Sequence, residues 1–225
     1  MIYLVRTLIS GLSLGSIYAL MALGYTMVYG VAKMLNFAHG DIIMVGAYSI
    51  IVAVSQAHLP PLAAVLISVA VCACLGVTVE FLAYRPLRQA PPLNVLITAI
   101  GVSYFLQNAA LLVFGSEQKA FPSIVSFPSL SVGGVEIDGI TLATLAVTAV
   151  IMASLTLFIS KTRIGKAMRA VSEDKGAAEL MGISVNRTIT LTFAVGSALA
   201  AVASIFFGAA YVYVRPTTGA MPGIK

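Results

Sequence analysis

Charged residues are scarce in this 225-residue chain: Asp, Glu, Lys and Arg together make up 9% of it, while 60% is hydrophobic. A soluble domain carries about a quarter charged residues. The mean hydropathy of +1.01 means that the chain has too much apolar surface to hide from water. The scarcity of charge therefore excludes a soluble domain and indicates an integral membrane protein.

Tryptophan is absent, and cysteine and histidine occur only twice each. Cys72 and Cys74 stand two residues apart in an apolar run, where a helix would point them to different faces, so no disulfide is expected. His39 and His58 lie far apart, with no cluster of acids or nucleophile beside a base. An enzyme site would need such a cluster. We therefore predict no catalytic residue, no metal site and no cofactor: the chain is not expected to be an enzyme.

The phosphate-binding motif G-x-x-x-x-G-K-[ST] does not occur either. The chain cannot bind ATP by that route, so any process that needs energy would draw it from a partner or from a gradient. The net charge of +5 does not indicate nucleic-acid binding, because the basic residues cluster in short loops between apolar runs. In that position they orient a protein in a lipid membrane.

Six apolar runs are long enough, or nearly so, to cross a hydrocarbon core of about 30 Å, which takes roughly 20 helical residues. Backbone groups in lipid must pair within their own segment, so the runs should be helices. The sequence predicts an all-α, polytopic transmembrane helical bundle, with one transmembrane domain over residues 1–225. The runs are 7–30, 40–57, 61–84, 94–115, 140–160 and 188–214.

The loops between these runs differ in charge. Residues 85–93 and 161–187 are rich in Lys and Arg, whereas 116–139 hold three acids and a single lysine. The positive-inside rule then makes 85–93 and 161–187 cytoplasmic and 116–139 a periplasmic loop. Counting backward leaves the N-terminus and Arg6 outside. A broken or re-entrant helix within 31–57 would instead put the N-terminus inside, and the sequence leaves both orientations open.

Small residues four apart mark faces on which helices pack closely in lipid. Gly11 and Gly15 form such a pair in the first run, and Gly196 and Ala200 form another in the last. We predict close helix packing at both pairs.

The cytoplasmic loop 161–187 has more pattern than a connector needs. Its apolar residues at helical spacing are Ile164, Met168 and Val171. A helix stop is expected at 174–176, followed by a short helix over 177–181 with Gly182 as its C-terminal cap. Two amphipathic helices across the cytoplasmic mouth would suit docking into a groove of a soluble partner. The alternative is a solvated loop whose arginines only enforce topology.

Three segments resemble a known family. They read "GYTMVYGV" at 24–31, "NFAHG" at 36–40 and "GKAMRAVSEDKGAAELMGISVNR" at 165–187. In this order they are similar to the membrane permeases for branched-chain amino acids, the high-affinity leucine/isoleucine/valine uptake system. The last segment also resembles the coupling motif of ABC importer permeases, Glu-Ala-Ala, three residues, then Gly. Ala177, Ala178 and Gly182 match that motif, while Gly176 stands in place of its glutamate.

The resemblance implies an ABC importer subunit in the bacterial inner membrane. Its partners would be cytoplasmic ATPase subunits that bind the ATP, a second permease subunit, identical or different, and a periplasmic substrate-binding protein. The residues expected to couple to the ATPase are Gly165, Arg169, Glu173, Asp174, Ala177, Ala178 and Gly182. The family's chain usually runs on for roughly two more helices after a segment like "RPTTGAMPGIK", so we expect this one to be truncated at its C-terminus.

The stretch "KMLNFAHGDIIMVGAY" places polar residues between two apolar runs. As a helix boundary, Gly40 would break the first helix and Asp41 would cap the next, while Asn36 and His39 satisfied freed carbonyls. As a translocation path, the same residues would present helix ends to a zwitterionic amino acid. The two interpretations are compatible. A third, in which His39 relays protons, lacks a paired intramembrane acid.

Other functions remain alternatives. Permeases for urea or short-chain amides are closely similar to this family and are the nearest alternative. A gradient-driven carrier or channel would call for ion-pairing acids inside the membrane, and beside Asp41 only Glu80 lies near a membrane run. A transport subunit driven by a separate ATPase is the function that the loop 161–187 favours.

Overall fold

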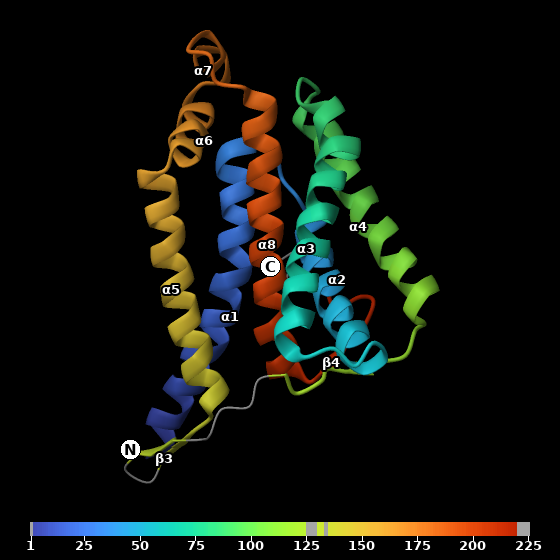
Figure 1. Ribbon diagram of the computed structural model, residues 1–225, viewed down its shortest axis with the longest axis vertical. Helices are drawn as coiled ribbons and strands as arrows, with labels where there is room; N and C mark the ends of the chain where they lie inside the picture. The colour runs from blue at the N-terminus through green and yellow to red at the C-terminus, as the bar shows by residue number, and fades with distance from the viewer. Residues whose placement is uncertain (1, 125–129, 133–134, 220–225) are drawn as a thin grey trace.

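Each of the six predicted apolar runs forms a helix in the computed structural model, which describes residues 2–124, 130–132 and 135–219 (Figure 1). Six helical spans in the described residues are long and apolar enough to cross a membrane, so the predicted polytopic bundle is confirmed. The long helices are α1 (Ile2–Ala32), α2 (His39–Ile51), α3 (Pro61–Val79), α4 (Pro92–Phe114), α5 (Gly139–Lys161) and α8 (Val185–Tyr211).

Two of these spans continue beyond the α-helix. The π-helix η1 (Val52–Gln56) extends α2, and the π-helix η2 (Glu80–Tyr84) extends α3, followed by the 3₁₀ turn η3 (Arg85–Leu87). Widened turns of this kind occur often at functional positions. Here η2 turns Glu80 and Tyr84 inward, and both are buried.

Helix α8 stands at the centre of the bundle, between α5 and α1 on one side and α2, α3 and α4 on the other (Figure 1). Glycines on α1 and α3 allow these two helices to cross α8 at close range. A Cβ on Gly24 of α1 would lie 2.8 Å from the Gly196 carbonyl oxygen, and one on Gly76 of α3 would lie 1.9 Å from Ser197 Oγ. Close backbone approach is how helices gain contact in lipid. The predicted close packing at Gly196 and Ala200 is confirmed, since both are buried.

The other small-residue prediction is wrong within this single chain. A Cβ on Gly11 or on Gly15 would meet nothing within 4 Å, and both positions are exposed. The reason is that the face of α1 that contacts α8 is the one that carries Gly24, further along the helix.

Short strands lie outside the long helices. β1 (Lys119–Ala120) pairs antiparallel with β4 (Tyr213–Val214), and β2 (Leu130–Val132) pairs antiparallel with β3 (Val135–Ile137). They add a little β-structure that the all-α prediction did not include. They lie at one end of the bundle with the N-terminal end of α1, opposite the short helices α6 (Arg163–Glu173) and α7 (Lys175–Leu180) (Figure 1).

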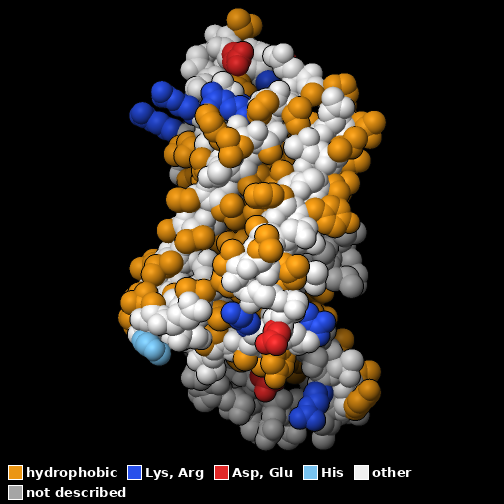
Figure 2. Space-filling view, turned by 90° about the vertical axis from the view of Figure 1, so that its right-hand side faces the viewer, with side chains coloured by type: hydrophobic (Ala, Val, Ile, Leu, Met, Phe, Trp, Pro, Cys, Tyr) orange, Lys and Arg blue, Asp and Glu red, His pale blue; other side chains and the backbone are white. Residues whose placement is uncertain are grey.

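The distribution of charge over the two ends of the bundle bears on how the protein is oriented in the membrane. Figure 2 shows Lys and Arg side chains at both ends of the molecule, mixed with acids at the lower end, and a largely hydrophobic band across the middle. Most of the Lys and Arg residues belong to the segments 85–93 and 161–187, at the α6–α7 end. The N-terminal end of α1 lies at the end of the bundle opposite α6 and α7. If the positive-inside rule holds for the basic end, the N-terminus is predicted to lie outside. The segment 33–38 is not helical, but it joins two crossing helices rather than forming a re-entrant one.

Candidate functional site

Helices α6 and α7 project from the end of the bundle that is predicted to be cytoplasmic, and each has a side-chain cap. Thr162 Oγ1 accepts a hydrogen bond from the Gly165 amide (3.0 Å), and Asp174 Oδ1 accepts from the amides of Gly176 (2.8 Å) and Ala177 (3.1 Å). Such caps satisfy the free amides of a helix N-terminus. The two predicted helices are therefore confirmed, although α7 begins at Lys175, two residues earlier than expected.

Gly182 ends α7, as predicted. Its φ is +80°, in the left-handed region that glycine adopts readily. The Gly182 amide donates to the Glu179 carbonyl (2.9 Å) and the Ile183 amide donates to the Ala178 carbonyl (3.0 Å). These two bonds form a Schellman motif, which fixes the end of α7 against its loop.

The apolar stripe of α6 is narrower than predicted. Met168 and Val171 are buried, but Ile164 is 42% exposed. Gly165 explains how α6 approaches α5 so closely: an added Cβ there would lie 2.4 Å from the Ile159 backbone. Since the contact is made at Gly165, its neighbour Ile164 is turned outward.

The tip of α7 exposes two large apolar side chains that were not among the predicted coupling residues. Leu180 is 91% exposed and Met181 is 82% exposed. Leu180 is the last residue of α7 and Met181 is its C-terminal cap residue, and α7 lies at one end of the molecule (Figure 1). The signal in the sequence was an adjacent pair of large apolar residues next to the predicted cap Gly182. Together they form an apolar tip on a capped, rigid turn.

The predicted coupling residues fall into two groups. Arg169, Glu173, Asp174 and Ala177 are exposed, whereas Gly165 and Ala178 are buried against the bundle. Gly182 is exposed at the turn. The Asp174 carboxylate accepts the hydrogen bonds that cap α7, which gives this residue a structural role in the fold. We call α6, α7 and the turn to Gly182 the coupling surface.

Asp41 lies in the first turn of α2, with its residue fully buried. The prediction that it caps this helix is wrong. Its carboxylate accepts hydrogen bonds from Ser103 Oγ (2.5 Å) and Gln107 Nε2 (3.1 Å), both on α4, and α2 has no side-chain cap. As the third residue of the helix, Asp41 points sideways toward α4, which offers two donors one turn apart.

Asn36 and His39 also differ from expectation, because neither satisfies a freed carbonyl. Asn36 Oδ1 accepts a hydrogen bond from Tyr84 OH (2.9 Å), which links the segment 33–38 to η2. His39 is 3% exposed, and neither of its ring nitrogens has a hydrogen-bond partner among the residues that the structure describes. Its ring lies edge-on to Tyr25, with 6.1 Å between ring centroids.

A segment near the end of the described chain, at Gly219, also lies close to Asp41. After β4 the backbone returns toward α2, and a Cβ on Gly219 would lie 2.5 Å from the Gly40 carbonyl oxygen and 2.7 Å from Asp41 Cα. Sequence reasoning did not connect these segments, which are almost 180 residues apart. Asp41, Ser103, Gln107 and Gly219 thus form a polar cluster inside the bundle.

A second polar cluster lies nearer the coupling surface. Glu80 is fully buried and forms an ion pair with Arg88, which also donates to Asn186 Oδ1. Thr190 Oγ1 donates to Glu80 Oε2 (2.8 Å). Glu80 was noted in the sequence as an acid near a membrane run, but its two partners, Arg88 and Thr190, could not be read from its neighbours in the sequence. Among the described residues, no group of three His, Cys, Asp or Glu could hold a metal ion.

Membrane-length helices, buried polar clusters between them and an exposed helical pair at one end together define a multi-pass membrane permease. Residues 7–225 match the family described as "Branched-chain amino acid transport system / permease component", and the chain belongs to that family. The resemblance drawn from its three motifs is therefore confirmed.

Two relatives of the chain are also described as permease proteins for branched-chain amino acid transport. The chain is 43% identical to the high-affinity branched-chain amino acid transport system permease protein BraD of Pseudomonas aeruginosa, over 98% of this chain and 76% of that protein. It is 38% identical to the corresponding permease protein LivH of Escherichia coli, over 100% of this chain and 77% of that protein. No solved structure matches the chain.

Family membership makes the chain a transport permease subunit and not itself an enzyme. It is a multi-pass protein of the bacterial inner membrane. The family match supports an importer permease over the carrier and channel alternatives.

Proposed function

We propose that this chain translocates branched-chain amino acids, using ATP hydrolysed by separate subunits that dock on its coupling surface. The observation that carries the docking part is the apolar tip of Leu180 and Met181, held beyond the membrane-spanning helices. A contiguous pair of exposed apolar side chains outside the membrane-spanning helices is typical of an interaction site. A helix presenting apolar residues at its end is suited to a groove in a soluble partner.

The proposal has a direct binding test. Burying two large apolar side chains stabilises a complex by about 3 kcal/mol, or roughly a hundredfold in affinity. The double variant Leu180→Ser/Met181→Ser should therefore lose the ATPase subunit during co-purification from membranes. A matched control is Val212→Ser/Tyr213→Ser, beyond the end of α8 at the opposite end of the bundle, where the side chains are 50% and 55% exposed.

The control should retain the ATPase, because it removes the same number of exposed apolar side chains away from the coupling surface. Equal retention by both variants would count against docking at α7. Loss in both would mean that assembly depends on general folding rather than on this tip.

The polar cluster around Asp41 supports the translocation part. Its carboxylate is buried among apolar helices with neutral donors as its partners, Ser103 and Gln107. A buried carboxylate without a cation attracts the ammonium group of an amino acid. The N-terminus of α2 carries a partial positive charge that favours the carboxylate. Asn36 lies just before this helix and His39 is its first residue, and we include all three in the path.

The choice of substrate is supported by the names of the relatives. BraD and LivH are described as permeases for branched-chain amino acids. The matching assay is uptake of labelled leucine and of labelled urea by cells that carry the complete system. Leucine uptake that depends on this chain supports the proposal, and urea uptake without leucine uptake would replace it.

A further inference from the structure

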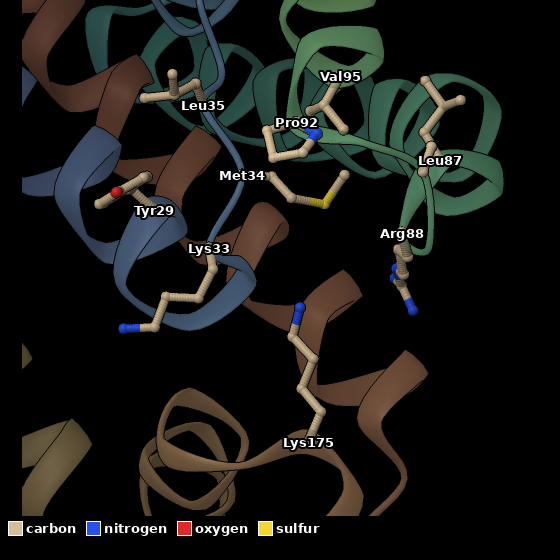
Figure 3. Close-up of a pocket in the computed structure, with 10 residues that line it drawn as sticks. Tyr29, Lys33, Met34, Leu35, Leu87, Arg88, Pro92, Val95 and Lys175 are labelled. Carbon is tan, nitrogen blue, oxygen red and sulfur yellow. The ribbon is translucent and has the colours of Figure 1, made fainter.

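A cavity of about 300 Å³ opens at the cytoplasmic end of the bundle. Its walls come from the end of α1, the segment after it, the turn after η3, the start of α4 and the first residue of α7 (Figure 3). It is separate from the polar cluster around Asp41, since no residue of that cluster lines it. It is also separate from the apolar tip of α7.

Three cationic side chains line this cavity: Lys33, Arg88 and Lys175. Figure 3 shows Lys175 rising from α7 into the space between Met34 and Arg88, while the Arg88 guanidinium reaches the same space from the other side. Lys33 extends along the outer side of α1. The residues lining the cavity include no carboxylate.

These charges are only partly compensated. Glu80 pairs with Arg88 and cancels one of the three. Lys175 Nζ donates to the Ala32 carbonyl (3.0 Å), at the C-terminal end of α1, where the helix contributes about half a negative charge. An excess of roughly one and a half positive charges remains around the cavity.

Two further observations indicate a missing anion. Arg88 Nε is buried and has no hydrogen-bond partner within the described part of the chain, although buried donors are normally satisfied. Burial, together with the charges of Arg88 and Lys33, lowers the pKa of Lys175. An anion in the cavity would relieve the repulsion among these cations and could accept from the free donor.

The remaining walls are apolar and indicate the kind of anion. Met34, Leu87 and Val95 line the cavity beside the cations, and Tyr29 and Leu35 at its edge are 46% and 38% exposed. The cavity lies at the level where the membrane-spanning helices end, which is the level of lipid headgroups. A free phosphate ion gains nothing from apolar walls, whereas a phospholipid places its phosphate among the cations and its glycerol and first methylene groups against them.

We propose that this cavity binds the phosphate group of an anionic phospholipid from the cytoplasmic leaflet. The lipid would neutralise Lys33 and Lys175 and bridge α1, the turn after η3 and α7. It would thereby connect the base of the coupling surface to the membrane.

The test uses the full chain in detergent and counts bound phosphatidylglycerol by native mass spectrometry. The double variant Lys33→Gln/Lys175→Gln removes the two uncompensated cations. The matched control Lys161→Gln/Lys166→Gln removes two exposed cations from the same end of the molecule, outside the cavity. A charge-retaining variant, Lys33→Arg/Lys175→Arg, tests whether the side chains act by charge.

The expected result is a site that binds phosphatidylglycerol roughly 30-fold more weakly in Lys33→Gln/Lys175→Gln, from the attraction that two basic side chains exert on an anionic headgroup. The control and the charge-retaining variant should bind like the original chain. Equal weakening in the Gln double variant and its control would overturn the proposal, because the attraction would then be diffuse. Absence of tight binding in the original chain would overturn it too.

A second arm separates the two sources of phosphate. The melting temperature is compared in phosphatidylcholine nanodiscs, in the same nanodiscs with inorganic phosphate, and in nanodiscs that contain phosphatidylglycerol. Stabilisation by phosphatidylglycerol alone supports the lipid. An equal rise with inorganic phosphate would overturn the lipid assignment and make the cavity a site for soluble anions.

Discussion

The buried carboxylate of Glu80 and the guanidinium of Arg88 form an ion pair that joins η2 to the turn eight residues further along. Because Arg88 also donates to Asn186 and Thr190 donates to Glu80, the same pair ties this turn to the start of α8. Asn186 follows the Schellman turn of α7 by four residues. The cluster therefore connects α3, α8 and the base of the coupling surface.

Arg88→Ala should destabilise the protein by about 3–5 kcal/mol, because it leaves the Glu80 carboxylate buried without its partner. Glu80→Gln/Arg88→Met removes both charges and should recover most of that loss. Thermal unfolding in detergent measures both variants. If Arg88→Ala melted like the original chain, the ion pair would contribute little to the fold.

Asp41→Asn keeps the shape of the side chain but removes its charge. If Asp41 attracts the substrate ammonium group, the variant should reach normal membrane levels yet take up leucine at least about tenfold less efficiently, mainly through a higher KM, since a charged hydrogen bond is worth about 1.5–3 kcal/mol. Ser103→Ala, which removes a neutral donor, is the comparison and should have a smaller effect. Normal uptake by Asp41→Asn would assign Asp41 a structural role only.

Gly165→Ala should disturb the contact between α5 and α6. An alanine gains about 1 kcal/mol in helix propensity, but its Cβ would lie 2.4 Å from the Ile159 backbone, and overpacking costs about 1–3 kcal/mol. We expect net destabilisation and weaker ATPase retention. Gly11→Ala is the control, since its Cβ would meet nothing within 4 Å, and it should be neutral or slightly stabilising. The same melting curve for both variants would contradict the contact.

Asp174→Ala should loosen α7 by about 1 kcal/mol, because the amides of Gly176 and Ala177 lose their acceptor. Hydrogen exchange of these two amides should accelerate roughly fivefold, while exchange in α8 stays unchanged. Asp174→Asn retains a capping oxygen and should exchange nearly like the original chain. Unchanged exchange in Asp174→Ala would show that the Schellman turn alone holds α7.

Much of the coupling surface could be predicted because its signals are local. A capping Asp, a Gly after the last helical residue and apolar spacing act within one or two turns, so they are readable along the chain. What the sequence did not reveal was the exposure of Ile164 and of the Leu180–Met181 tip. In an apolar chain, a hydrophobic residue in a loop can face the bundle or a partner, and only the packing at Gly165 and the turn at Gly182 decided which.

The polar stretch shows the limit of local reasoning. Asp41 before an apolar run has the pattern of a helix cap, and nothing nearby in the sequence indicates Ser103 and Gln107, which lie more than 60 residues away. The same holds for Tyr84 as the partner of Asn36. In an apolar interior each buried polar group takes whichever donor or acceptor lies within reach, and that depends on how the helices are arranged.

The sequence by itself determined that this chain is a membrane protein, where its helices lie and which end is basic, because each of these follows from composition and from the backbone's need to pair its hydrogen bonds in lipid. Its motifs also indicated the family. The tertiary structure decided that α8 is central, that Glu80 pairs with Arg88 and that three cations surround one cavity. The physical reason is that these contacts join residues distant in sequence, and they form only where glycines allow the helices to approach.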